Sequence, residues 1–175
     1  MLHESLSTQR YHMGLTEEPT APPGTTLETL LTLDVVCVLP ADHALCRRGD
    51  KVLTPQDFAG QDVVYLAEVD PYRQRVDRLF GELGIERRMV VETLSASAVC
   101  ETVSLGMGIA IVNPITALSY ARSGLQIRRF SHAIPYLVNL VQPMFRPESP
   151  VVASFVEVLK SSCQSIEAEL LAITG

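Results

Sequence analysis

The feature that most constrains this chain is an alternation of short apolar runs with segments of helical periodicity. Most of the apolar runs are continuous stretches of Val, Ile and Leu rather than alternations of apolar and polar residues. Such runs are typical of strands buried on both faces, as in parallel sheets. The sequence therefore predicts largely parallel strands at Tyr11–Leu15, Val35–Leu39, Val63–Leu66, Met89–Thr93, Ile109–Val112, Leu125–Phe130 and Tyr136–Val141.

Most of the predicted helices start with a residue that can cap the first turn. In Thr54-Pro55-Gln56-Asp57, a cap residue is followed by Pro at the first helical position and by an acid three residues after the cap. The other helices are expected to start at Asp70, at Ser95 or Ser97, at Asn113 and after Pro150. The last one carries an apolar stripe of Val152, Phe155, Leu159, Cys163, Ile166 and Leu170.

Strands that alternate with helices of this length indicate an α/β fold built from βαβ units. Thr20–Thr26 (TAPPGTT) is expected to be a surface loop. Two passages marked by Pro, Leu39-Pro40 and Ile134-Pro135, bracket a central block whose strand–helix pattern is self-contained. The chain is therefore expected to form two lobes, one inserted into the other and joined by two crossings.

Composition excludes several classes of protein. The 175 residues are 47% hydrophobic and 19% charged, which is typical of a globular protein and not of a disordered or fibrous one. The formal net charge of -6 argues against a surface that coats nucleic acid. No apolar run is long enough for a membrane helix, and the N-terminus shows no signal-peptide pattern, so we expect a cytoplasmic location.

Familiar catalytic and metal-binding motifs are not found in the sequence. Gly106-Met107-Gly108 follows a predicted helix and precedes a strand, the reverse of a dinucleotide-binding fingerprint, so it is interpreted as a helix end and a tight turn. The cysteines form no C-x-x-C pair, and Cys37 and Cys100 are expected to be buried apolar residues. Cys46, beside Arg47 and Arg48, is the one thiol whose neighbours favour a lowered pKa and a redox-sensing role.

Since no catalytic or metal-binding motif is found, ligand binding is the function class that remains. Two helix starts, Asp70–Arg73 and Ser95–Ala98, closely follow predicted strands. Their N–H groups and the positive end of the helix dipole suit a carboxylate, although a helix-capping role without any ligand explains the same residues. The basic run of Arg73, Arg75, Arg78, Arg87 and Arg88 is interspersed with acids, and we interpret it as a solvated face with ion pairs rather than a DNA surface.

Four stretches, in this order, carry a resemblance to a known family: VVCVLPADHAL (35–45), LTPQDFAGQDVVYL (53–66), VETLSASAVCETVSLGMGIAIVNP (91–114) and LQIRRF (125–130). They resemble the effector-binding domain of LysR-type bacterial transcriptional regulators, over about Tyr11 to about Lys160. The resemblance implies the fold of type 2 periplasmic binding proteins, which is an α/β fold with two lobes and a cleft between them. It places one lobe at residues 1–40 and 135–175 and the other at 41–134.

The resemblance also implies a function and a site. Such regulators bind a small metabolite in the cleft, which here would be carboxylate or amino-acid-like, and the sequence looks most like members that control opine or amino-acid catabolism. The expected effector-binding residues are Ser95, Ala96 and Ser97 at one helix start, Asp70, Tyr72 and Arg73 in the neighbouring loop, and Thr16 from the first lobe. No catalytic residue, cofactor or metal is expected, and the implied assembly is a homodimer or tetramer.

The sequence departs from the family pattern in two ways. The helix-turn-helix domain that contacts DNA and the beginning of the first lobe would lie before His3, so the first lobe is expected to be incomplete. His12 stands where the family usually has Asp. We therefore expect the isolated chain to bind carboxylates weakly and to self-associate through an exposed sheet edge. A stand-alone solute-binding module of the same fold is the alternative, and an enzyme on this fold would need a nucleophile–base pair that the spacing does not reveal.

Overall fold

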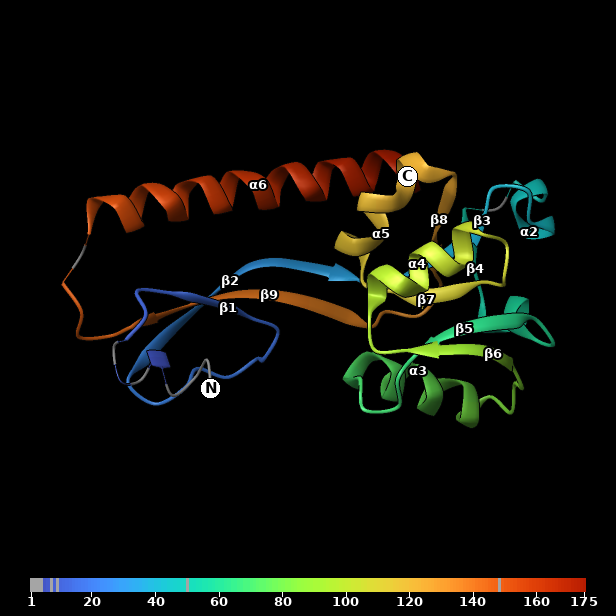
Figure 1. The fold of residues 1–175 in the computed structure, drawn as a ribbon, viewed down its shortest axis with the longest axis horizontal. Helices are drawn as coiled ribbons and strands as arrows, with labels where there is room; N and C mark the ends of the chain where they lie inside the picture. The colour runs from blue at the N-terminus through green and yellow to red at the C-terminus, as the bar shows by residue number, and fades with distance from the viewer. Residues whose placement is uncertain (1–4, 7, 9, 50, 148) are drawn as a thin grey trace. The chain divides into compact units, whose positions relative to one another are not determined.

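The computed structural model describes residues 5–6, 8, 10–49, 51–147 and 149–175, so His3 lies outside the described residues. The chain divides into two compact units. Unit 1 comprises residues 1–33 and 136–169, and unit 2 comprises residues 34–135 and 170–175. Figure 1 shows the course of the chain through its labelled elements. None of the described helices combines the length and the apolar character that crossing a bilayer requires.

Unit 1 is built on a three-stranded sheet in the order β1-β9-β2, with β1 at Gly14–Thr16, β9 at Pro135–Pro143 and β2 at Thr25–Asp34. β1 pairs antiparallel to β9, so that Thr16 lies opposite Asn139. The long helix α6 spans Pro150–Thr174 and extends from unit 1 into unit 2.

The apolar stripe predicted for α6 is largely confirmed. Cys163 and Leu170 are buried, but Phe155 is 53% exposed and Val156 is buried in its place. The helix therefore presents Val156, one position further along, to its neighbours. The spacing of three or four residues fits either choice, and only packing selects between them.

In unit 2, one sheet has the order β4-β8-β3-β7, formed by Val52–Leu53, Leu125–Phe130, Val36–Pro40 and Ala110–Val112. β3 is buried along its whole length, as the continuous apolar run predicts. The prediction of largely parallel pairing is wrong here, because β3 runs antiparallel to both β7 and β8. Burial on both faces gives the same sequence signature whatever the direction of the neighbouring strands.

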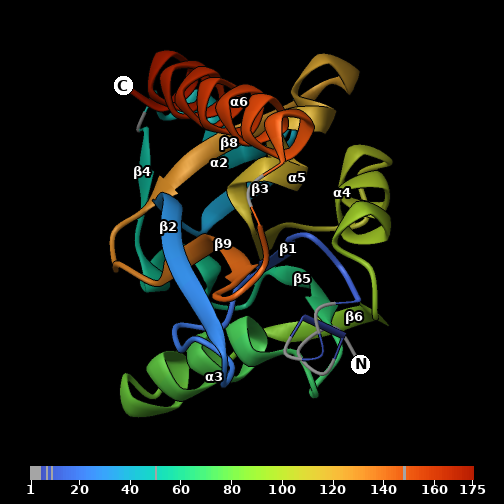
Figure 2. The same ribbon diagram turned by 90° about the vertical axis from the view of Figure 1, so that its left-hand side faces the viewer.

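The second sheet of unit 2 is the parallel pair β5 (Asp62–Leu66) and β6 (Arg88–Thr93), as predicted. Helix α3 (Pro71–Glu82) covers one face of this pair and α4 (Ala96–Ser104) lies on the other, as two views show (Figures 1 and 2). The core beneath α3 is aromatic, since the rings of Phe58, Phe80 and Phe130 pack within about 6.2 Å of one another.

The remaining elements are short. They are α2 (Ala44–Arg47), the 3-10 helices η1 (Pro55–Phe58) and η2 (Ala121–Ser123), and α5 (Pro114–Tyr120). η1 starts at the predicted capping box of Thr54 and Asp57, although it forms a 3-10 helix of four residues. The sequence did not reveal β2, whose first two residues fall in the predicted loop Thr20–Thr26. The Leu spacing in TTLETLLTLD follows no strict alternation, and β-pairing decides its conformation.

The four cysteines are free thiols. Cys37 and Cys100 are fully buried as predicted, and burial raises the pKa of the Cys100 thiol to about 12. The suggestion of a lowered pKa at Cys46 is wrong. Burial raises the pKa of its thiol, and Arg128, rather than its sequence neighbours, opposes that rise. The Cys46 thiol instead donates to the carbonyl of Pro40 at 3.5 Å.

Candidate functional site

The candidate site lies in unit 2, where the carboxyl ends of β5 and β6 meet. Leu66 and Thr93 are register partners at these two ends. The Ala67 N–H donates to the carbonyl of Thr93 at 2.9 Å, which holds the two loops together just beyond the sheet. α3 and α4 therefore begin from neighbouring strand ends, the position where open α/β sheets bind ligands.

The first turn of α3 is already filled by a carboxylate of the protein itself. Asp70 is the N-cap, and its Oδ1 accepts from the N–H groups of Tyr72 at 2.8 Å and Arg73 at 3.0 Å. Pro71 has no N–H to offer. Asp70, predicted as an effector-binding residue, thus satisfies the donors that an external carboxylate would need.

The first turn of α4 is different. Its N-cap is the uncharged Ser95, whose Oγ accepts from the Ala98 N–H at a long 3.4 Å. Among the described residues, the N–H groups of Ala96 and Ser97 have no acceptor. Both Ser95 and Ser97 are exposed. Of the two predicted cradles, α4 is therefore the one that can still receive an anion.

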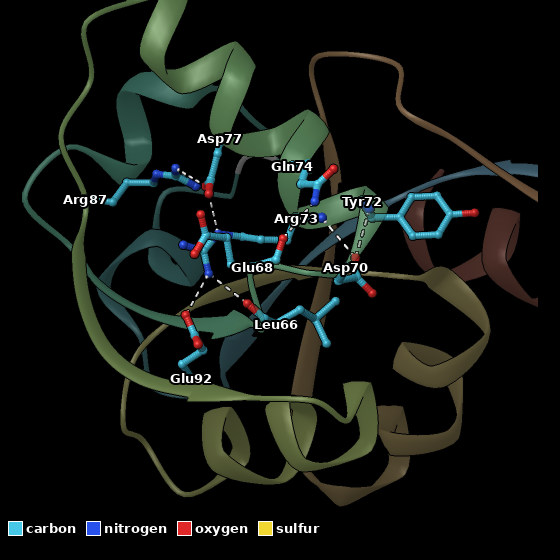
Figure 3. Close-up of polar contacts among 9 residues, drawn as sticks. All are labelled: Leu66, Glu68, Asp70, Tyr72, Arg73, Gln74, Asp77, Arg87 and Glu92. Atoms are coloured by element: carbon cyan, nitrogen blue, oxygen red, sulfur yellow. Dashed lines mark hydrogen bonds and ion pairs between the residues drawn. The ribbon is translucent and has the colours of Figure 1, made fainter.

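Arg73 was predicted as a cation for a ligand, and its side chain is instead largely engaged within unit 2. The guanidinium donates to Asp77 Oδ2 at 2.5 Å and to the carbonyl of Leu66 at 2.7 Å, and lies 3.4 Å from Glu92 Oε2. Its side chain is 14% exposed. Figure 3 shows these contacts, with the Tyr72 ring pointing away from them. Arg73 thus ties the end of β5 to α3 and leaves little freedom to reach outward.

Asp77 and two aromatic rings complete this cluster. Asp77 also accepts from Arg87 at 2.7 Å. The Arg73 guanidinium lies 4.0 Å from the centre of the Tyr65 ring, and that of Arg87 lies 3.9 Å from the centre of the Phe80 ring. Burial raises the pKa of the Tyr65 hydroxyl. These are cation–π contacts in a partly desolvated setting.

The interpretation of the basic run as a solvated face with ion pairs is therefore correct in part. Arg88 is exposed and pairs with Asp62. Arg73 and Arg87 are instead packed over aromatic rings with side-chain exposures of 14% and 10%. They pack in this way because the ring of Tyr65, on β5, lies beneath both guanidinium groups. Arg73 and Arg87 are far apart in the sequence, so their shared contact with Tyr65 could not be predicted from it.

Thr16, the remaining predicted site residue, belongs to unit 1 and ends β1. Its hydroxyl oxygen accepts from the Glu18 N–H at 3.1 Å. Beside it, Asn139 is fully buried, and its Nδ2 donates to the Glu18 carbonyl at 2.9 Å. Asn139 Oδ1 has no hydrogen-bond partner among the described residues.

Comparison with known proteins identifies the family. The family model of the LysR substrate binding domain matches residues 1–164. The chain belongs to the LysR substrate-binding domain family. It is 49% identical over 173 residues to the transcriptional activator protein LysR of Escherichia coli K12, covering 99% of this chain and 55% of that protein. It is 28% identical to the regulatory protein NocR of Agrobacterium tumefaciens, covering 96% of this chain and 55% of NocR. The chain thus spans about half the length of these curated relatives.

Solved structures place this LysR-family chain in the same fold. The CcmR regulatory domain of Synechocystis PCC6803, solved in complex with 2-PG, has a TM-score of 0.69 at 19% identity, with 93% of this chain and 78% of that chain covered. The BenM effector binding domain with its effector benzoate has a TM-score of 0.67 at 17% identity, with 96% and 76% covered. The predicted fold class, α/β of the type 2 periplasmic-binding-protein kind, is confirmed.

Two apolar residues at the candidate site were not predicted. Val69, in the loop after β5, is 77% exposed, and Leu94, in the loop after β6, is 81% exposed. Large apolar side chains this exposed, at the edge of a sheet and beside helix N-termini, are suited to a surface that a ligand or another part of the protein covers. In the sequence, both residues could have been found by the same pattern, an apolar residue that lies beyond the end of the strand and directly before the residue that caps the next helix.

Metal binding finds no support in the described part of the chain. Nowhere in it do three or more His, Cys, Asp or Glu side chains gather closely enough to hold a metal ion. At the start of α4, the polar groups are the N–H groups of Ala96 and Ser97 and the hydroxyls of Ser95 and Ser97, and such donors are suited to recognising an anion.

Proposed function

We propose that this chain is the effector-sensing domain of a bacterial LysR-type transcriptional regulator and that it binds a small carboxylate or amino-acid-like metabolite. Membership in the LysR substrate-binding domain family supports the class of function. The two compact units support a two-lobed domain, and we assign residues 1–40 and 135–175 to one lobe and 41–134 to the other. Two solved proteins of the same fold are described in complex with 2-PG and with the effector benzoate, which supports a small-molecule ligand.

The observation that carries the proposal is the contrast between the two helix starts. At α3 the Asp70 carboxylate already accepts from two N–H groups, whereas at α4 the cap is a neutral serine and the Ala96 and Ser97 N–H groups lack acceptors. An incoming carboxylate would accept hydrogen bonds from the N–H groups at the start of α4, as the Asp70 carboxylate does at the start of α3. The helix dipole favours a negative charge at that position by up to about 1 kcal/mol when exposed and by more when the site is covered.

We assign roles in this site to five of the predicted residues. Ser95 and Ser97 offer hydroxyls and Ala96 a backbone donor, while Asp70 fixes the neighbouring loop. Arg73 adds a positive charge behind the site and holds the end of β5, which makes it a positioning residue. Tyr72 and Thr16 are the remaining predicted effector-binding residues, and Thr16 belongs to the other lobe.

The proposed mechanism is a population shift. A metabolite that binds the closed arrangement of the lobes more tightly than the open one favours closure in proportion to that difference in affinity. In the complete regulator, a homodimer or tetramer in the cytoplasm would pass this change to a helix-turn-helix domain that holds DNA. We assign no catalytic step to the chain. A stand-alone solute-binding module of this fold is the alternative, and an in-frame helix-turn-helix coding segment upstream of the chain would decide against it.

A pair of substitutions at Ser95 tests the site. Ser95→Asp places a carboxylate on the N-terminus of α4, as Asp70 does on α3, and it preserves capping because Asp caps about as well as Ser. Ser95→Asn is the matched neutral control. A panel of amino acids and opines is titrated into the ¹⁵N-labelled chain, and the amide signals of Ala96 and Ser97 are followed.

We expect weak binding by at least one carboxylate, with affinity lowered at least about tenfold in Ser95→Asp and changed less than about threefold in Ser95→Asn. Urea unfolding should show both variants as stable as the native chain. Unchanged affinity in Ser95→Asp would refute the proposed site. Micromolar affinity in the native chain would instead refute the expectation that the isolated chain binds weakly.

A further inference from the structure

A second face of α3 forms one wall of a groove that the proposed effector site does not use. Arg75, Arg78, Leu79 and Glu82 follow helical spacing and line this groove, whose volume is about 520 Å³. The opposite wall is the loop between β8 and β9, at His132–Pro135. The volume lies within the range of small-molecule sites. The groove lies entirely within unit 2.

The loop wall is held in place by hydrogen bonds at both of its ends. The Ser131 N–H donates to the Leu53 carbonyl at 2.9 Å, and the Val35 N–H donates to the Ile134 carbonyl at 3.1 Å. These bonds attach the loop to strands of the β4-β8-β3-β7 sheet and to the residue preceding β3. The walls of the groove are therefore preformed, which lowers the cost of ordering them around a ligand.

The two arginines in this groove differ from the neighbouring arginines of unit 2. Arg73, Arg87 and Arg88 each pair with a carboxylate. Among the described residues, Arg75 and Arg78 have no carboxylate within ion-pair distance. Arg75 is oriented nonetheless, because its Nη1 donates to the Pro135 carbonyl at 3.3 Å and its guanidinium lies 5.3 Å from the centre of the Tyr72 ring.

The rest of the lining is suited to an anion with an apolar body. His132 faces the groove opposite the arginines, and Glu82 is the one acid in the lining. Ile134 is 6% exposed and Leu79 packs against the same core, so together they give the groove an apolar floor. Two guanidinium groups above an apolar floor can receive a carboxylate and its hydrocarbon part at the same time.

We propose that this groove is a second binding site, for a small organic carboxylate with an apolar body. It is distinct from the site at the start of α4 and does not depend on it. Bound there, the ligand would bridge α3 to the loop that ends at Pro135, where the chain passes from unit 2 to unit 1. A ligand in the groove would therefore restrain a connection between the units, the one at Pro135.

Three probes and two variants test the proposal in the 175-residue chain. The probes are phenylacetate, which has both charge and an apolar body, acetate, which has the charge alone, and benzyl alcohol, which lacks the charge. Binding is followed through the amide signals of Leu79, His132 and Ala133, so that binding elsewhere is not counted. The variants are the double substitution Arg75→Gln/Arg78→Gln and the control Arg122→Gln, an exposed arginine of η2.

We expect phenylacetate to saturate these signals, with acetate and benzyl alcohol each binding at least about fivefold more weakly. The double variant should lower phenylacetate affinity at least about tenfold, and Arg122→Gln should leave it unchanged. The Ser95→Asp variant should bind phenylacetate in the groove as the native chain does, which separates this site from the proposed effector site. The proposal is overturned by absence of saturation, by equal binding of all three probes, or by unchanged affinity in a double variant with a native-like spectrum.

Discussion

Substituting Gly108 with alanine tests how the turn before β7 positions α4 on the sheet. Gly108 has a φ of +144°, and an added Cβ would lie 2.5 Å from the backbone oxygen of Asp62. That oxygen accepts from the Ile109 N–H at 2.9 Å, in the bridge that joins β5 to the residue preceding β7. The clash is with backbone, so relief requires the two segments to separate.

The expected cost adds two effects. An L-residue forced to positive φ loses roughly 1–2 kcal/mol. Separating the segments weakens two hydrogen bonds, Ile109 N–H to Asp62 and Val64 N–H to Ile109, at about 1 kcal/mol each. Gly108→Ala should therefore lower the free energy of unfolding by about 3–4 kcal/mol, measured by urea denaturation of the chain.

Gly106→Ala is the matched control in the same turn. Gly106 has a φ of +84° and nothing within 4 Å of an added Cβ, so the backbone cost alone applies and about 1–2 kcal/mol should be lost. Equal losses of unfolding free energy in the two variants would refute the reasoning, because they would mean that the clash with the Asp62 backbone does not affect stability. A larger loss at Gly106 would refute it as well.

Three further outcomes are expected. Asp77→Asn removes the carboxylate shared by two largely buried guanidinium groups and should cost about 2 kcal/mol by urea denaturation. Burial alone would raise the pKa of Asp57, but hydrogen bonds from Thr54 and Arg48 outweigh it and lower that pKa. The resulting stabilisation is complete above the pKa of the unfolded carboxyl and is lost as pH falls through the lowered folded pKa, so Asp57→Asn should flatten the acid limb of a stability–pH curve. Because β1 is an end strand of its sheet, the chain should self-associate through it, and Leu15→Lys should weaken this association in sedimentation experiments.

Controls distinguish these effects from general damage. Asp42→Asn, at an exposed acid, should change stability by less than about 0.5 kcal/mol, and a loss equal to that of Asp77→Asn would argue against the shared carboxylate. A stability–pH curve that is the same with and without Asp57 would contradict its role in acid sensitivity. Leu171→Lys alters an exposed apolar residue of α6 that belongs to no sheet and should leave association intact. A native chain that sediments as a monomer at high concentration would contradict the edge-strand prediction.

The sequence by itself determined the elements that depend on local chemistry. The caps at Asp70, Ser95 and Asn113 begin helices where predicted, because a side-chain oxygen satisfies N–H groups only a few residues away. The continuous apolar runs of β3 and β5 are buried, because burial depends on composition along the run. The order and spacing of four motifs were enough to predict the family and the fold class.

Only the tertiary structure decided which partners these elements meet. Strand direction was mispredicted for β3, because an apolar run reports burial and not the direction of the strand beside it. Arg73 and Arg75 lie on one short helix, yet one is enclosed by Asp77, Leu66 and Tyr65 while the other lines an open groove. The difference between the two helix starts likewise depends on which donors each capping side chain reaches. Contacts between residues distant in sequence are set by packing, and the local periodicity of the sequence does not predict them.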